Sequence, residues 1–300
     1  VNTPVRVHNN MYWPTPLVVA AARGQCRCFN AWIAAGADVN RGGPAVVAAA
    51  AAKIDCLNAL IVAGAAVNNE TRSGRVPAIV ASEAGKIDCL NVLITAGADV
   101  NFMNVHGETP LSVATQRGNI HCLNALIAAG ADMNEPMGPH RDPPLFYAVG
   151  KTPASRQAPI LNALLAAGAD VNVRRERTHE TIAIAAVWRG IPEGLESLIA
   201  ARMDVNVKDS RGRTAAMIAC ERSNLRILKV LLEARADVDA ADVQGLSKQL
   251  RHQTAAIVYD QRYRPCVEAL EAAAAQAAAA VRSEQLLTLH VADPSDDGSI

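Results

Sequence analysis

The stretches KIDCLNALIVAGAAVN at residues 53–68 and KIDCLNVLITAGADVN at residues 86–101 are nearly the same sixteen residues, written 33 positions apart. Chance does not keep a Cys, a Leu, an Asn and a Gly in fixed register over that length, so the chain copies a structural unit. A repeat of this period is typical of solenoids, in which each unit packs only on its neighbours. The repeat therefore decides the fold.

The ending of this unit, a glycine followed by Ala-Asp-Val-Asn or a close variant, recurs along most of the chain. The commonest spacing between successive copies is about 33 residues, the same period as that of the two opening stretches. Arginine takes the place of the glycine in the last two copies. The seven positions are Gly36, Gly64, Gly97, Gly130, Gly168, Arg202 and Arg235.

Each copy predicts two short antiparallel helices. A proline stands at a constant distance before each of the first four glycine positions, and Thr15 or Thr109 precedes it in two copies. This pair starts the first helix through an N-cap hydroxyl and a fixed φ. A break near Gly24, Gly85, Gly118 or Gly190 follows, and the repeat glycine then closes the second helix in a left-handed conformation. The asparagines that end the repeats are expected to bond the turn that follows them. They are Asn40, Asn68, Asn101, Asn134, Asn172 and Asn206.

The segment GETPLSVATQRGNIHCLNALIAAGADMN, residues 107–134, resembles an ankyrin repeat, and six other segments resemble one too. The resemblance covers roughly residues 11–250 and implies an all-α ankyrin-repeat solenoid of helix-turn-helix units with β-hairpin-like fingers, to which the sequence adds a long C-terminal helix. The predicted parts are an N-terminal extension or remnant of an upstream repeat (1–12), repeats at 13–41, 42–69, 70–102, 103–135, 136–173, 174–207 and 208–241, a degenerate capping repeat and linker (242–264), a helix (265–290) and an acidic disordered tail (291–300).

Three departures from the regular pattern are expected to alter the structure locally. The finger between Asn40 and Pro44 is five residues shorter than that between Asn101 and Pro110. The fifth repeat carries four extra residues within GKTPASRQAP, whose prolines are expected to end its first helix early. Arg202 and Arg235 replace the capping glycine at a cost of about 1–2 kcal/mol each, so these helix ends are expected to fray or to be capped differently.

Composition and motifs exclude several classes of function. The 29 basic and 29 acidic residues cancel, which favours neither nucleic acid nor an anionic membrane as a partner, and no apolar run is long enough for membrane insertion. The triplet Gly150-Lys151-Thr152 lacks the upstream glycine of a phosphate-binding loop, and the histidines never fall at metal-pair spacing. The sequence therefore predicts a protein that is not an enzyme and that uses no cofactor and no metal.

The seven cysteines favour an intracellular, reducing compartment, with the cytoplasm as the expected location. Four of them fall at the same point of successive repeats, on helices whose axes should lie about 8–10 Å apart. Disulfides need Cα atoms at about 4.4–6.8 Å, so packing is favoured over bonding or zinc ligation. These four are Cys28, Cys56, Cys89 and Cys122.

The resemblance implies that finger tips and the exposed side of the first helices form a long concave face that binds other proteins. Arginine is frequent at these positions, and two interpretations stay open: an ordinary solvated face, or a groove for an acidic or mixed-charge protein segment. The candidate partner-binding residues are Arg72, Arg75, Glu83, His106, Glu108, Gln116, Arg117, Tyr147, Arg177, Trp188, Arg189, Arg211, Arg213, Glu221 and Arg222.

The aromatic residues are assigned separate roles. Trp188 lies at an outward position and is predicted to anchor a partner, with packing under the insertion in the fifth repeat as the alternative. Tyr147, beside that insertion, is compatible with either role. Trp32 takes the register of Leu60 and Leu93 and is predicted to lie in the core.

The predicted function is a non-catalytic protein-protein interaction module or scaffold that binds its partner through the Arg-rich concave face. One alternative is a structural or accessory subunit of a large assembly, docked through the helix at 265–290. That helix has an apolar stripe that suits either a cap on the last repeat or a docking surface. A further alternative is a substrate adaptor for a modifying enzyme.

Overall fold

The computed structural model describes residues 15–138, 141–175 and 178–236, together with residues 265, 266, 268–273, 275, 276 and 279. The chain divides into two compact units, Val1–Arg177 and Thr178–Ile300, and each is described by itself. In the described part of both units the regular structure is helical and contains no strand. The all-α prediction is confirmed, whereas the length of the predicted C-terminal helix lies largely outside the described residues.

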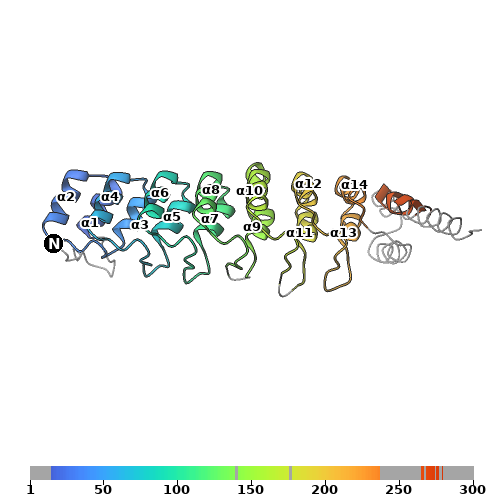
Figure 1. Cartoon of the computed structure of the whole chain (residues 1–300), viewed down its shortest axis with the longest axis horizontal. Helices are drawn as coiled ribbons and strands as arrows, with labels where there is room; N and C mark the ends of the chain where they lie inside the picture. The colour runs from blue at the N-terminus through green and yellow to red at the C-terminus, as the bar shows by residue number, and fades with distance from the viewer. Residues whose placement is uncertain are drawn as a thin grey trace, which may run out of the picture. The chain divides into compact units, whose positions relative to one another are not determined.

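The first unit contains five helix pairs in two layers (Figure 1). The first helices of the pairs pack on one another in chain order, and so do the second helices. Fingers project from the first-helix side, as Figure 1 shows. The pairs are α1 (Pro16–Arg23) with α2 (Cys26–Ala34), α3 (Pro44–Ala50) with α4 (Ile54–Val62), α5 (Pro77–Glu83) with α6 (Ile87–Thr95), α7 (Pro110–Arg117) with α8 (Ile120–Ala128), and α9 (Pro144–Gly150) with α10 (Ala154–Ala166).

The second unit repeats the same arrangement. Its helices are α11 (Ile182–Arg189), α12 (Pro192–Ala200), α13 (Ala215–Glu221) and α14 (Leu225–Glu233). Helix α11 packs on α13 and α12 packs on α14. The C-terminal segment joins this core through Cys266, which is buried and lies within hydrogen-bonding reach of the Cys220 thiol on α13.

The core is a row of thin layers rather than one central mass. Leucines of the second helices, including Leu60, Leu93 and Leu126, have no exposed surface and form a layer that neighbouring repeats share. The prediction for Trp32 is wrong, because its side chain is only half-buried while Phe29, one turn earlier, is completely buried. In later repeats, the residue at this position is covered by the second helix of the preceding repeat. In the part of the chain that the structure describes, no second helix of a pair precedes α2, so the side chain of Trp32 stays partly accessible.

The helix starts follow the predicted chemistry. The Thr109 hydroxyl accepts the N–H of Ser112 at 3.2 Å and the Ser112 hydroxyl accepts the N–H of Thr109 at 2.9 Å, which together form a capping box. The hydroxyls of Thr181 and Thr214 cap α11 and α13, although no proline follows them. A hydroxyl cap is therefore sufficient to begin the first helix of a repeat.

The helix ends at Arg202 and Arg235 correct an expectation. Both residues adopt the left-handed conformation of the repeat glycines, with φ of 64° and 60° against 84° at Gly97. The N–H of Arg202 donates to the carbonyl of Ile199 at 2.9 Å, as Gly97 does to Ile94 at 3.0 Å. These ends are neither frayed nor capped differently, so the packing of the repeat imposes the strained backbone on arginine.

The asparagines that end the repeats bond farther away than predicted. Asn68 Oδ1 accepts the N–H of Asp99 at 2.8 Å, and Asn101 Oδ1 accepts the N–H of Asp132 at 2.8 Å, each time in the next repeat. The aspartate two positions before each asparagine supplies the local turn, since Asp99 Oδ1 accepts the N–H of Asn101 at 2.9 Å. The motif thus joins neighbouring repeats instead of closing its own turn only.

The insertion in the fifth repeat also differs from expectation. Helix α9 has seven residues, as many as α3 and α5, so the prolines of the insertion do not end it early. The extra residues lengthen the second helix, α10, to 13 residues with Pro159 inside it. Gln157 of this extension donates to the carbonyls of Ala148 at 3.0 Å and Val149 at 2.6 Å, and so satisfies the end of α9.

At the left-handed residue that ends each second helix, replacing glycine by alanine should destabilise the protein, and replacing arginine by glycine should stabilise it. A Cβ on Gly97 would meet nothing within 4 Å, so Gly97→Ala should lower the free energy of unfolding by about 1 kcal/mol through backbone strain alone. Arg202→Gly should relieve that strain and raise stability by up to about 1 kcal/mol, less the backbone entropy that glycine adds. Urea unfolding followed by circular dichroism tests both, and shifts of the same sign would contradict the assignment.

Candidate functional site

The finger face of each unit, meaning the finger turns and the exposed side of the odd-numbered helices, is held by buried polar side chains. Asn104 is 6% exposed, and its Oδ1 accepts the N–H groups of His106 at 3.0 Å and Glu108 at 2.8 Å. Its Nδ2 donates to the carbonyl of Gly74 in the preceding finger at 2.9 Å. Asp209 has the corresponding role in the second unit, where its Oδ1 accepts from the N–H groups of Arg211 and Arg213. The fingers are therefore fixed supports for the side chains they carry.

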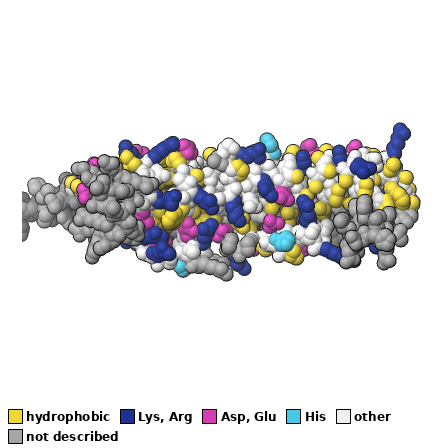
Figure 2. Space-filling model, turned by 180° about the vertical axis from the view of Figure 1, so that it is seen from behind, with side chains coloured by type: hydrophobic (Ala, Val, Ile, Leu, Met, Phe, Trp, Pro, Cys, Tyr) yellow, Lys and Arg dark blue, Asp and Glu magenta, His cyan; other side chains and the backbone are white. Residues whose placement is uncertain are grey.

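Opposite charges on this face pair with one another. Glu83 Oε1 lies 2.6 Å from Arg117 Nη2, and Glu83 Oε2 lies 3.9 Å from Arg75 Nη2. In the face seen in Figure 2, basic and acidic side chains are interspersed and do not form separate regions. The positive charge of the arginines on this face is thus partly neutralised by glutamates of the same chain.

A cleft of about 630 Å³ lies between the finger of the fourth repeat and helices α7 and α9. Gln116 and Lys151 line it, and Lys151 Nζ lies 4.5 Å from the centre of the Tyr147 ring. Tyr147 itself is only 5% exposed and its hydroxyl donates to the carbonyl of Met137 at 3.0 Å. Burial raises the pKa of this phenol above its ordinary value. Tyr147 therefore supports the cleft and offers little surface to a partner.

Trp188, at the end of α11, is an exposed aromatic residue, with 40% of its surface accessible. The guanidinium carbon of Arg222 lies over its ring at 4.8 Å from the centroid, and that of Arg213 lies at 6.0 Å. Arg213 Nη2 lies 2.9 Å from Asp209 Oδ2, and Arg213 Nη1 lies 3.2 Å from Glu221 Oε2. These five side chains form one group, the Trp188 cluster, and all of them except Asp209 are predicted partner-binding residues.

The Asp209 carboxylate of this cluster stays ionised under ordinary conditions. Burial by itself would raise its pKa, but the N–H groups of Arg213 and Arg211 and the Arg213 guanidinium together hold the pKa below its usual value. The carboxylate therefore neutralises Arg213 and fixes its position beside Trp188.

The remaining predicted residues differ in their surroundings. Within the described residues, Arg72, Arg189, Arg211 and Arg222 are exposed and have no ion pair. Glu108 Oε2 accepts from Asn104 Nδ2 at 3.1 Å, and His106 Nε2 lies 3.4 Å from the carbonyl of Ser73. Arg177 lies outside the described residues.

Sequence reasoning missed two supports of the face in the first unit. Arg175 donates through Nε to Asp142 Oδ1 at 2.9 Å and through Nη2 to Asp142 Oδ2 at 3.0 Å, while its guanidinium lies over Phe146. Lys151, considered only as part of a failed phosphate-binding motif, packs on Tyr147. No local pattern predicts the contacts of Arg175, because they join residues about one repeat apart. Lys151 and Tyr147 are four residues apart, a spacing at which helical side chains are neighbours, so their contact was open to local reasoning.

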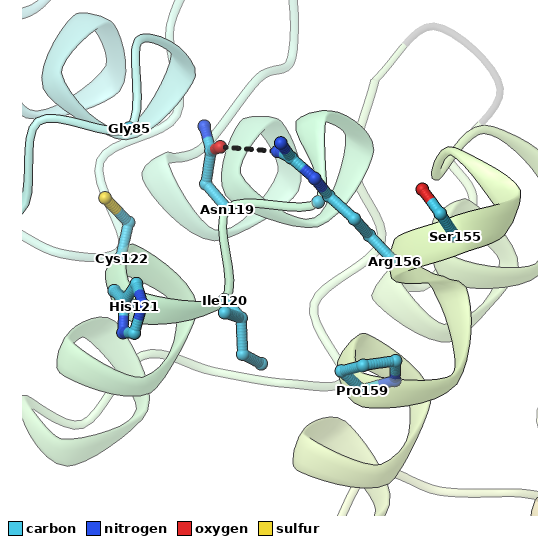
Figure 3. Close-up of a pocket in the computed structure, with 9 residues that line it drawn as sticks. Gly85, Asn119, Ile120, His121, Cys122, Ser155, Arg156 and Pro159 are labelled. Atoms are coloured by element: carbon cyan, nitrogen blue, oxygen red, sulfur yellow. Dashed lines mark hydrogen bonds between the residues drawn. The ribbon is translucent and has the colours of Figure 1, made fainter.

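A second pocket, of about 290 Å³, lies where the turns between paired helices meet α10 (Figure 3). Arg156 bridges it by donating to Asn119 Oδ1 at 3.5 Å. Cys122 and His121 also line it, but adjacent helical residues do not face one another, so they do not form a nucleophile and base. Burial also raises the pKa of the Cys122 thiol to about 11, which keeps it protonated. This pocket carries no sign of nucleophilic chemistry.

All seven cysteines are free, and only part of the predicted ladder is buried. Cys56, Cys89 and Cys122 are buried, whereas Cys28 is exposed and the Cys26 sulfur instead lies 4.0 Å from that of Cys56. Among the described residues no cluster of three or more His, Cys, Asp or Glu side chains is arranged to hold a metal ion. In that same part of the chain, no helix combines the length and hydropathy needed to cross a bilayer.

Comparison with known families identifies the fold. A family model described as ankyrin repeats in three copies matches residues 17–104, 45–137, 80–175 and 145–242. The chain belongs to the ankyrin repeat family. Ankyrin repeat domains generally mediate protein-protein interactions and are typically non-catalytic. No curated protein matches the chain.

Solved ankyrin repeat domains are similar to this chain over most of its length. The human ASB11 domain shares 26% identity with a TM-score of 0.62, covering 74% of this chain and 99% of that one. The domain of Bcl-3, a member of the IkappaB family, shares 25% identity with a TM-score of 0.64, covering 72% and 97%. A domain from Acinetobacter baumannii AYE shares 25% identity with a TM-score of 0.59, covering 65% and 98%.

Two substitutions compare how much the buried hydrogen bonds of a finger and the exposed ion pairs of the face contribute to stability. Asn104→Ala removes the partner of three backbone groups, in one buried and two partly buried hydrogen bonds, and should lower the free energy of unfolding by about 1–3 kcal/mol. Glu83→Gln removes only exposed ion pairs and should change it by less than about 1 kcal/mol. Chemical denaturation of the two variants measures both effects, and a larger loss for Glu83→Gln would contradict the analysis.

The buried thiols should react slowly. Only the thiolate is alkylated, and at pH 8 the thiolate fraction at a pKa of about 11 is about 100-fold smaller than at the ordinary value of 9.0. Alkylation of Cys122 should therefore be about 100-fold slower in the folded chain than in urea. Mass spectrometry of peptides after iodoacetamide treatment gives the rates. Exposed Cys28 serves as the internal control and should react at similar rates in both states.

Proposed function

We propose that this chain binds a segment of another protein on its finger face, without catalysing a reaction on it. The observation that carries the proposal is the Trp188 cluster, in which an exposed aromatic ring contacts the guanidinium groups of two arginines. Tryptophan and arginine are the residue types most often responsible for binding energy at protein interfaces. Membership of the ankyrin repeat family supports the same class of function.

The rigidity of the face favours binding. Arg213 is held by two carboxylates, and Asp209 is held in turn by two backbone N–H groups of its own finger. Side chains fixed before association lose less conformational entropy when the partner arrives. The exposed arginines without ion pairs then provide charge for a partner of acidic or mixed composition.

The C-terminal helix is a weaker candidate for docking. Cys266 is 1% exposed and Leu270 is 3% exposed, so these two apolar residues of the described C-terminal segment are already covered within the chain. This burial supports the role of a cap on the last repeat. The roles of assembly subunit and of substrate adaptor stay predictions.

Removing the anchor should weaken binding without unfolding the protein. Trp188→Ala combined with Arg189→Ala should change the free energy of unfolding by no more than about 0.5 kcal/mol, because both side chains are exposed. The same two substitutions should weaken binding of the partner by more than about 1 kcal/mol. Crosslinking mass spectrometry in cell extract identifies the partner and the face it contacts, and titration calorimetry then compares the variants.

The matched control combines Glu271→Arg with Gln276→Arg, because both residues lie on the exposed side of the C-terminal helix. This control should leave affinity unchanged. If it releases the partner while the Trp188 variant does not, the docking-helix alternative is correct and the finger-face proposal is wrong.

A further inference from the structure

The two arginines that contact Trp188 differ in what their N–H groups do. Arg213 uses Nε and Nη2 on Asp209 Oδ2, at 3.1 and 2.9 Å, and Nη1 on Glu221 Oε2 at 3.2 Å. Arg222 has neither an ion pair nor a side-chain hydrogen bond within the described residues. Its guanidinium carbon lies 4.8 Å from the centre of the Trp188 ring, a cation-π contact that uses none of its N–H groups as hydrogen-bond donors to the described residues.

The surrounding carboxylates do not compete for Arg222. The side chains of Asp209 and Glu221 are only 7% and 15% exposed, and both are bonded to Arg213. Arg189, the residue after Trp188, is exposed and has no ion pair in the described part of the chain. The accessible charged groups of the Trp188 cluster and its neighbour are therefore the guanidinium groups of Arg222 and Arg189, whereas the two carboxylates are largely buried and both pair with Arg213.

From this arrangement, and on the basis of the proposed function, we infer that the edge of the Arg222 guanidinium receives an aspartate or glutamate side chain of the bound protein segment. A guanidinium presents its N–H groups as a planar fork that matches the two oxygens of one carboxylate. The Trp188 ring holds that fork in place before the partner arrives. The exposed part of the ring is then available to an apolar residue beside the acid.

The position of Arg222 suits this role. It follows α13 directly, as the C-cap residue, and is exposed. Lysine at this position would keep the charge but lose the planar fork and most of the stacking on Trp188. The chemistry therefore predicts that arginine and lysine are not interchangeable here.

A peptide selection followed by a double-mutant cycle tests the inference. The full chain is used to select from a random library of short peptides, and the selected peptides should be enriched in Asp and Glu. In one selected peptide, replacing the critical Glu by Gln should weaken binding to the native chain about tenfold, but to Arg222→Gln less than twofold. Arg222→Lys should lose most of the affinity that Arg222→Gln loses.

Arg226→Gln is the matched control, because Arg226 is an exposed arginine of the same unit that lies on α14 and pairs with the exposed Glu193. It should bind the peptide as the native chain does. Fluorescence anisotropy of labelled peptides gives the affinities, and thermal unfolding confirms that each variant is folded.

The outcomes separate the inference from the proposed function. Selected peptides that are neutral or basic, yet lose binding with Trp188→Ala and Arg189→Ala, would overturn the carboxylate assignment and leave the finger face as the binding site. Equal losses for the Glu→Gln peptide on the native chain and on Arg222→Gln would also overturn it. A phosphoserine peptide that binds tenfold tighter than the Glu peptide would reassign the site to phosphate. A library that yields no binder counts against both proposals.

Discussion

The hydrogen bond from one repeat's asparagine to the next repeat's backbone is the contact on which the regularity of the first unit depends. Asn40, Asn68, Asn101 and Asn134 each accept a backbone N–H from the following repeat, at 2.8 to 2.9 Å. A polar side chain that replaces water at a backbone group fixes distance and direction, which apolar contacts alone do not. The leucine layers supply the energy of stacking, and the asparagines fix its spacing.

This spacing in turn fixes what the finger face carries. Asn104 is bonded both to its own finger and to the preceding one, so side chains such as His106 and Glu108 are presented on a rigid support. Arginines then sort into two groups by their neighbours. Those beside a carboxylate, such as Arg117 and Arg213, stiffen the face, while those without one retain their charge for a partner.

The repeat register made most of the fold predictable. Local rules were sufficient for Thr109 at a helix start and Gly97 at a helix end, because each acts on its own turn. Local rules failed where contacts with other repeats determine the conformation or the burial of a residue. Arg202 adopts a strained backbone that local preference opposes, and Trp32 is only half-buried on α2, which no second helix of a pair precedes among residues 15–236.

For the described residues, the sequence by itself determined the number of helix pairs and their order, since these follow from period and hydrophobic pattern. Only the tertiary structure decided which charges stay available, because ion pairs such as Arg117 with Glu83 join residues one repeat apart. It also decided that Tyr147 turns inward and Trp188 outward, although both occupy first helices. Burial and pairing depend on distances between repeats, and no local pattern of residues contains those distances.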